Sequence, residues 1–224
     1  IARRHGLVVI EDCAHALGGS LHSLPLGSFG DLAVFSFGRD KMISSVFGGA
    51  VCVKDKKTAK VLKEFEGHLL SPPLFFIYQQ LFYLIIYAIS LPFYNIGLGK
   101  IILRATSMFG LLSKAIRPEE RRGKMPPFIH YAFPQKLGCL LFHQWKKIEI
   151  FTRHRKAISE IYIKKLSLPL KSYPYIRVPF VVKNKIAFLD RAKRFGIHLG
   201  NWYRSPIDPS GKDATVFHYK KCKE

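Results

Sequence analysis

The hydrophobic pattern of the chain is clearest between residues 8 and 53, which hold three short apolar runs. Residues 8–10 are β-branched and precede two acids, residues 31–37 form a second run, and residues 48–53 form a third behind a glycine pair. Short β-branched or aromatic runs with polar or glycine ends predict strands. Because the runs are continuous rather than alternating, we expect a sheet covered on both faces, as in α/β proteins.

Two later segments carry apolar residues at the spacing of an amphipathic helix. One begins at Lys54 and is predicted to end near Gly67. The other, residues 130–166, is predicted to form a long helix that is broken once. A predicted strand at 177–182, a helix at 186–195 and a second strand-like run then indicate a small α/β domain.

An unusual apolar segment separates these two regions. Residues 69–99 contain no charged residue, and residues 74–91 are almost wholly apolar and aromatic. A helix of about 20 such residues crosses a bilayer, but two glutamines and Pro92 interrupt this one, and its tyrosines are not confined to two belts. The pattern favours a segment lying in one leaflet beside the basic residues 100–122. A buried helix pair or a dimer contact is the alternative.

Charge is distributed unevenly along the chain. Its 224 residues are 48% hydrophobic and 23% charged, which is typical of a globular protein. The net charge is +21, and residues 100–224 carry 27 Lys and Arg against 8 Asp and Glu. Such a surface attracts anionic phospholipid or nucleotide diphosphates. No zinc-finger, helix-turn-helix or RNP-like pattern favours a nucleic acid as partner.

Cysteine and histidine usage restricts the chemistry further. The four cysteines have no CxxC spacing, which favours a reducing, cytoplasmic setting over a disulfide framework. The nine histidines form no HExxH motif, so we expect no metal site. The opening residues, IARRHGL, indicate the end of a helix before the first strand, and we therefore expect the sequence to start within a domain.

Three side chains at or beyond the predicted strand ends suggest a shared ligand. They are Asp12, Ser36 and Lys41, and ligands of such sheets bind beyond the strand ends. Pyridoxal phosphate would use all three: an acid beside its ring nitrogen, a hydroxyl at its phosphate and a lysine for the Schiff base. The alternatives are a helix N-cap for Asp12, a hydrogen bond within its own loop for Ser36, and a solvated loop position for Lys41.

At these positions the sequence resembles a known family. The stretches EDCAHALGG, GSFGDLAVFSFGRDK and FGGAV are similar to the signature of the DegT/DnrJ/StrS sugar aminotransferases. The resemblance implies an α/β chain of the pyridoxal-phosphate-dependent transferase fold type I. It implies the C-terminal part of a large cofactor-binding domain at 1–68, an insertion at 69–115, and a linker helix with a small C-terminal α/β domain at 116–224.

The resemblance also implies roles for individual residues. Lys41 would be the catalytic Schiff-base lysine, and Asp12 the partner of the pyridine nitrogen. His15 would lie near the phenolic oxygen of the cofactor, with a polar structural role as its alternative, and Ser36 would bind the phosphate. The chain departs from the family just before Lys41, where Gly-Arg-Asp replaces a frequent His-Pro-Thr run.

Four further residues are substrate-site candidates. His130 and Tyr131 lie where the family has an Asn-Tyr-Arg run, of which only the tyrosine agrees. Trp202 and Tyr203 would face the substrate, or else pack on the core of the small domain.

The function that the resemblance implies is amino transfer, from glutamate, to a nucleotide-linked keto sugar for surface polysaccharide or lipopolysaccharide. It implies a cytoplasmic homodimer, and the segment 69–99 adds contact with the inner face of the membrane. Residues 1–224 by themselves are expected to be inactive, because family members have a long N-terminal portion. The alternatives are a non-catalytic relative that binds a nucleotide sugar or a regulatory partner, and a membrane-surface binding protein.

Overall fold

The structure, a computed structural model, describes residues 1–114, 117–121 and 123–200. The chain divides into two compact units. The first comprises Ile1–Ala115 and His130–Val178, and the second comprises Ile116–Ile129 and Pro179–Glu224. All of the strands described below belong to the first unit.

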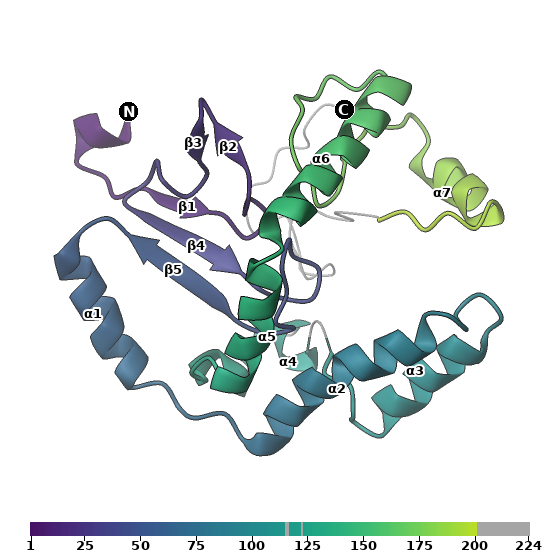
Figure 1. Ribbon diagram of the computed structural model, residues 1–224, viewed down its shortest axis with the longest axis horizontal. Helices are drawn as coiled ribbons and strands as arrows, with labels where there is room; N and C mark the ends of the chain where they lie inside the picture. The colour runs from purple at the N-terminus through teal and green to yellow at the C-terminus, as the bar shows by residue number, and fades with distance from the viewer. Residues whose placement is uncertain (115–116, 122, 201–224) are drawn as a thin grey trace. The chain divides into compact units, whose positions relative to one another are not determined.

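A three-stranded sheet forms the centre of the first unit (Figure 1). Its order is β1 (Ile10–Asp12), β4 (Leu32–Ser36) and β5 (Gly49–Val53), with β1 parallel and β5 antiparallel to β4. A separate hairpin joins β2 (Ser20–Leu21) to β3 (Leu24–Pro25). The three predicted strands are therefore confirmed, although the first begins two residues later than predicted.

The sheet is not covered on both faces by the residues that the structure describes. Ile10, Val34 and Val51 are exposed, and the register places them on one face, because Asp12 pairs with Val34 and Val34 pairs with Val51. The opposite face carries the fully buried Ala33. The expectation of two covered faces is therefore wrong for this part of the chain. Apolar composition marks a face as able to be buried, but it does not supply the layer that buries it.

The sequence correctly predicted the local elements at both sides of the sheet. The 3-10 helix η1 (Ala2–His5) ends at Gly6, whose φ of 62° is left-handed. After β5, Asp55 caps α1 (Lys56–Gly67) by accepting a hydrogen bond from Thr58 N at 2.8 Å. The end of η1 at Gly6 and the end of α1 at Gly67 agree with the predicted boundaries.

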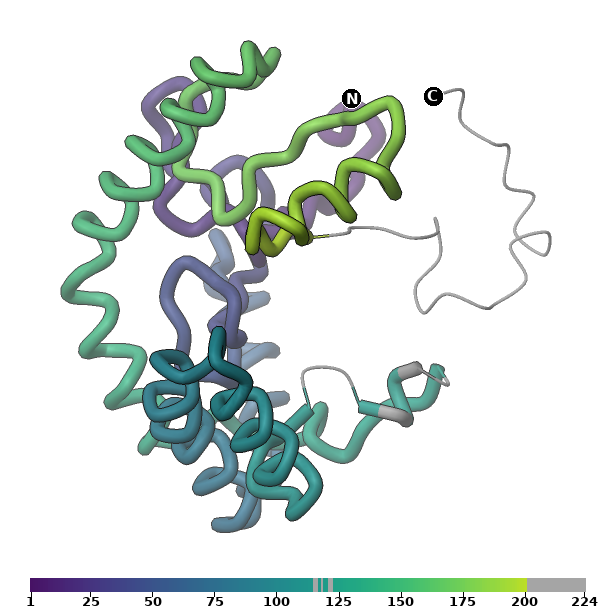
Figure 2. The backbone as a smooth tube through the Cα atoms, turned by 90° about the vertical axis from the view of Figure 1, so that its right-hand side faces the viewer, coloured from purple at the N-terminus to yellow at the C-terminus, as the bar shows by residue number. Residues whose placement is uncertain are grey.

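The apolar segment forms a helical hairpin of α2 (Leu74–Ser90) and α3 (Leu98–Met108), which lie side by side in Figures 1 and 2. Gly99 permits their close approach, since a Cβ there would collide with the backbone oxygen of Ser90. Gln79 Nε2 also donates a 2.6 Å hydrogen bond to the carbonyl of Gly110. None of the helices in the described ranges has the length and apolar character needed to cross a membrane.

The predicted broken helix is confirmed as α5 (Gln135–Trp145) and α6 (Ile148–Lys165). Leu137 on α5 is fully buried. The remaining helices are α4 (Pro118–Arg121), η2 (Pro127–His130) and α7 (Lys185–Arg194), the last as predicted. The predicted strand at 177–182 is wrong, because these residues join no ladder in the described chain. A β-branched run forms a strand only where a neighbouring strand can pair with it.

Candidate functional site

The carboxyl ends of β1 and β4 bring two candidate residues to one edge of the sheet. Asp12 is the last residue of β1, and Ser36 is the last residue of β4. These strands are parallel, and Asp12 pairs with Val34. Because side chains two residues apart on a strand share a face, Asp12 and Ser36 point to the same side of the sheet. The predicted convergence at the strand ends is present in the backbone register.

Lys41 and His15 meet beyond these strand ends. Lys41 Nζ lies 2.7 Å from His15 Nε2, which joins the loop after β4 to the turn after β1. Burial, and then the charge of Lys41, lower the pKa of His15 below its ordinary value of 6.5. The imidazole is therefore neutral at pH 7, and a neutral Nε2 accepts a hydrogen bond from the ammonium group.

Gly38 separates Ser36 from Lys41 in space as well as in sequence. A methyl group built at Gly38 would lie 3.5 Å from Ser36 Oγ and 3.9 Å from Lys41 Cε. Ser36 Oγ also accepts a long hydrogen bond of 3.4 Å from Gly38 N. The hydroxyl and the lysine stem thus both lie within van der Waals distance of the same position beside Gly38.

Asp12 takes part in a local hydrogen bond. Its Oδ1 accepts from Ala14 N at 3.0 Å, and its side chain is otherwise exposed. This bond closes a turn within the loop after β1, and it is not the helix N-cap weighed as the alternative, because the next element after β1 is the strand β2. A carboxylate has about four acceptor positions, so this one bond leaves Asp12 able to accept from a ligand as well.

The loop that carries Lys41 is held rigidly on its far side. Met42, Ile43 and Ser45 are buried. The amide of Gln144 on α5 pairs with the backbone of Ser44, accepting from its N–H at 2.9 Å and donating to its carbonyl at 2.7 Å. Packed and doubly hydrogen-bonded neighbours fix a functional side chain in one geometry.

Arg39 connects this loop to the helical hairpin, which sequence reasoning did not anticipate. Its guanidinium lies 4.2 Å from the ring centroid of Tyr83 on α2 and donates to Ser113 Oγ. Ser113 in turn donates to Gln80 Oε1 at 2.8 Å. Burial lowers the pKa of Arg39, and its contacts with Tyr83 and Tyr87 oppose that shift. Arg39, which stands where the sequence departs from the family pattern before the lysine, therefore has its partners on α2 and in the segment after α3.

Asp40 makes the second unanticipated contact. Its carboxylate pairs with Arg177 at 2.5 Å, and both side chains are about half exposed. Partial burial acts to raise the pKa of Asp40, but the hydrogen bond and charge of Arg177 outweigh it, and the pKa is lowered. No local sequence signal marks this pair, because its members are 137 residues apart.

The other substrate-site candidates have different surroundings. The ring of Tyr131 packs edge-on against Phe76 with centroids 5.2 Å apart, and Phe76 packs against Phe47. His130 is exposed, and its carbonyl accepts from Leu70 N at 2.8 Å. Trp202 and Tyr203 lie outside the described residues. The structure thus groups Tyr131 with an apolar cluster at the start of α2.

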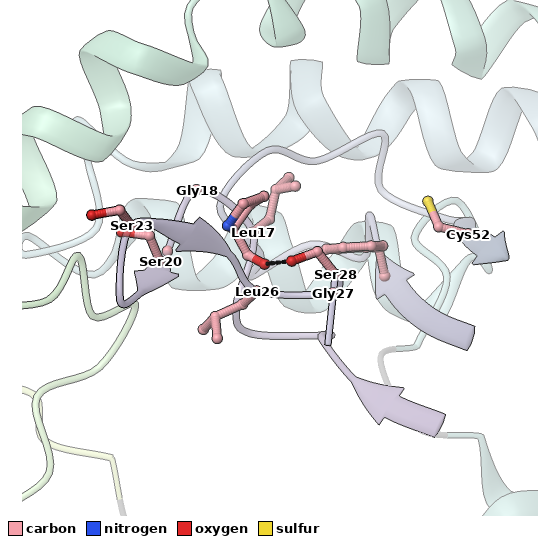
Figure 3. A pocket seen from close by; sticks show the side chains of 11 residues that line it. Leu17, Gly18, Ser20, Ser23, Leu26, Gly27, Ser28 and Cys52 are labelled. Atoms are coloured by element: carbon pink, nitrogen blue, oxygen red, sulfur yellow. Dashed lines mark hydrogen bonds between the residues drawn. The ribbon is translucent and has the colours of Figure 1, made fainter. Parts of the chain in front are cut away.

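A cavity of about 470 Å³ lies beside the β2–β3 hairpin, and it is not the candidate site (Figure 3). Phe35 and Cys52 contribute to its wall from the sheet face opposite to Asp12 and Ser36. The rest of its lining comes from residues 17–20, 23 and 25–28. Neither Lys41 nor His15 contributes to it.

The resemblance to the family is confirmed for the first third of the chain. Residues 1–73 match the model of the DegT/DnrJ/EryC1/StrS aminotransferase family. This segment contains Asp12, His15, Ser36 and Lys41.

Curated relatives are similar over segments of up to about the same length. GDP-perosamine synthase of Caulobacter vibrioides is 39% identical over 72 residues, which are 32% of this chain and 19% of that protein. L-glutamine:scyllo-inosose aminotransferase of Streptomyces griseus is 46% identical over 59 residues, or 26% of this chain and 14% of that protein. The chain thus spans less than a fifth of the length of these relatives.

Solved structures extend the similarity of fold to most of the chain. A DegT DnrJ EryC1 StrS aminotransferase from Brucella abortus covers 87% of this chain, with 42% of its own length, a TM-score of 0.56 and 16% identity. GDP-4-keto-6-deoxy-D-mannose-3-dehydratase of E. coli covers 88%, with 46% of its own length, a TM-score of 0.55 and 13% identity. The chain therefore has part of the fold that these proteins share, which confirms the predicted α/β class.

Proposed function

We propose that this chain is part of a pyridoxal-phosphate-dependent aminotransferase that acts on a nucleotide-linked keto sugar. The observation that carries the proposal is the contact of Lys41 Nζ with His15 Nε2. It lies at the strand ends that present Asp12 and Ser36, within the segment that matches the family.

The chemistry of the four side chains fits the cofactor. Lys41 supplies an amine for the aldehyde group, and Ser36 supplies a hydroxyl for the phosphate. Asp12 is a carboxylate on the same sheet face as Ser36 and would pair with the protonated ring nitrogen. His15, kept neutral by burial and by Lys41, would accept or donate a hydrogen bond at the phenolic oxygen.

The proposed reaction uses these residues in separate ways. Bound pyridoxal phosphate supplies an electron sink for the bond that breaks at the substrate carbon. Lys41, once its amine is free, would take the proton from that carbon as a general base and, as a general acid, would deliver it to the carbon that was the aldehyde carbon of the cofactor. The neutral imidazole of His15 would hold the lysine amine by accepting a hydrogen bond from Nζ with the lone pair of Nε2. Asp12, as an anion, would keep the ring nitrogen protonated.

The names of the relatives suggest the substrate. GDP-perosamine synthase and a UDP-N-acetyl-3-dehydro-alpha-D-glucosamine 3-aminotransferase of Acidithiobacillus ferrooxidans, 39% identical over 69 residues, are named for nucleotide sugars. We infer that this protein likewise transfers an amino group, from glutamate, to a nucleotide-linked keto sugar for lipopolysaccharide or another surface polysaccharide. A homodimer in the cytoplasm is part of the same proposal.

Covalent capture of the cofactor tests the proposal without requiring turnover. The protein is incubated with pyridoxal phosphate and reduced with borohydride, and the labelled peptide is located by mass spectrometry. We expect the label at Lys41 and its loss in Lys41→Ala, while Lys54→Ala, which removes the exposed lysine that follows β5, leaves it intact. Labelling spread equally over surface lysines would contradict the proposal and favour the non-catalytic alternative.

A further inference from the structure

Helix α2 has a buried inner face and an exposed apolar face. The inner face includes Phe76, Ile77, Gln80 and Ser90, all of them buried. The opposite face forms what we call the outer stripe, whose residues are 45–65% exposed. The outer stripe consists of Phe75, Tyr78, Phe82, Ile85 and Ile89. Its alternating spacing of three and four residues places all five on one side of the helix.

The exposed apolar surface continues around the turn of the hairpin. Leu91, Phe93 and Ile96 are exposed between the helices. On α3, Leu98 and Ile101 are exposed three residues apart, which places them on one side of that helix. Scattered exposed apolar residues are ordinary, but exposed apolar residues that follow one another along α2, the turn and α3 are the pattern expected of an interaction site.

The charged residues of the hairpin itself all have one sign. Residues 67–118 contain no Asp or Glu. Lys100 and Arg104 are exposed on α3, and Lys100 Nζ lies 5.1 Å from the ring centroid of Tyr94 at the turn. Lys136 Nζ donates to the hydroxyl of Tyr78 on the outer stripe at 3.3 Å. Cations beside exposed aromatic rings are typical of the boundary between lipid headgroups and acyl chains.

We propose that the α2–α3 hairpin binds the surface of a bilayer that contains anionic phospholipid. The outer stripe and the turn would enter the headgroup and upper acyl region, while Lys100, Arg104 and Lys136 would contact lipid phosphates. This proposal goes beyond the aminotransferase reaction and does not depend on it.

Charge favours lipid over a second copy of the chain. A second copy would bring another net charge of +21 to a hairpin whose own charged residues are all cations. Because Arg39 joins the Lys41 loop to Tyr83 and Ser113, binding through the hairpin would hold that loop near the membrane surface.

Vesicle flotation tests the proposal directly. The 224-residue protein is floated with phosphatidylcholine vesicles and with vesicles that also contain phosphatidylserine. We expect the protein to float with the anionic vesicles. In Phe82→Ser/Ile85→Ser, each of the two changes should lower the affinity for these vesicles by a factor of about ten or more. The matched control Val61→Ser/Phe65→Ser removes two apolar side chains of α1 that are 58% and 63% exposed, against 46% and 54% for Phe82 and Ile85, and is expected to float like the parent.

A second variant tests the electrostatic part without removing any apolar side chain. Lys100→Gln/Arg104→Gln should lower the affinity for anionic vesicles by a factor of about five per cation, with the far-UV circular dichroism spectrum unchanged. Equal flotation of the outer-stripe and α1 variants would overturn the proposal. So would a dimer in light scattering that depends on the outer stripe, combined with no flotation of the parent.

Discussion

Replacing Arg39 by Met should detach the helical hairpin from the lysine loop. Arg39 loses its hydrogen bond to Ser113 and its position over the ring of Tyr83. A hydrogen bond to a charged group contributes about 1.5–3 kcal/mol, and a cation–π contact about 0.5–2 kcal/mol. Methionine retains the apolar packing and removes the cost of burying a guanidinium. We therefore expect the free energy of unfolding to fall by about 2 kcal/mol.

Two measurements separate this contact from general destabilisation. Urea unfolding gives the free energy of Arg39→Met, Ser113→Ala and the double variant, and amide exchange shows whether α2 and α3 lose protection first. Arg153→Met, an exposed position on α6, serves as control and should change stability by less than about 0.5 kcal/mol. The reasoning is refuted if Arg39→Met matches this control, or if the Arg39 and Ser113 effects simply add.

Three further variants test other parts of the structure. Leu137→Ala, at a fully buried position, should cost about 3–5 kcal/mol in urea unfolding. Gly99→Ala should lower the melting temperature, since its Cβ collides with backbone, whereas Gly138→Ala, whose Cβ meets only Phe133 at 3.6 Å, should not. Because the pKa of His15 is lowered in the folded chain, the unfolded chain binds a proton at this residue more readily than the folded chain does. Stability should therefore fall as the pH drops below 6.5, and His15→Gln, but not the exposed His22→Gln, should reduce that slope in urea unfolding at a series of pH values.

The elements that the sequence predicted correctly are those whose formation depends on residues close to one another in the sequence. The runs at 31–37 and 48–53 became β4 and β5, and the helical spacing after residue 54 became α1. The open sheet face depends on which layer packs against the sheet, and the missing strand at 177–182 depends on whether a partner strand lies beside it. A local sequence pattern indicates neither. For the same reason the apolar segment left a segment in one leaflet, a helix pair and a dimer contact open as interpretations, and the structure shows a packed helix pair of which one face is exposed.

The candidate site divides in the same way. Asp12, His15, Ser36 and Lys41 lie within thirty residues of one another in the sequence, and the parallel pairing of β1 with β4 brings them to one edge. The partners of Arg39 and Asp40 were not predictable, because Ser113 is 74 residues from Arg39 and Arg177 is 137 residues from Asp40. The sequence identified both residues only as part of the departure from the family pattern before Lys41.

The pair between Asp40 and Arg177 makes the lysine loop sensitive to the surrounding electrolyte. Both side chains are about half exposed, so dissolved ions compete for them, and such a pair contributes about 0.2–1 kcal/mol. Charges at the surface are screened over about 8 Å at physiological ionic strength and over about 3 Å at 1 M salt. The segment after α6 is therefore bound more loosely to the residue before Lys41 in concentrated salt. Ionic strength thus becomes a variable that sets the flexibility around this lysine, and buffers of different salt content would sample differently restrained forms of the same loop.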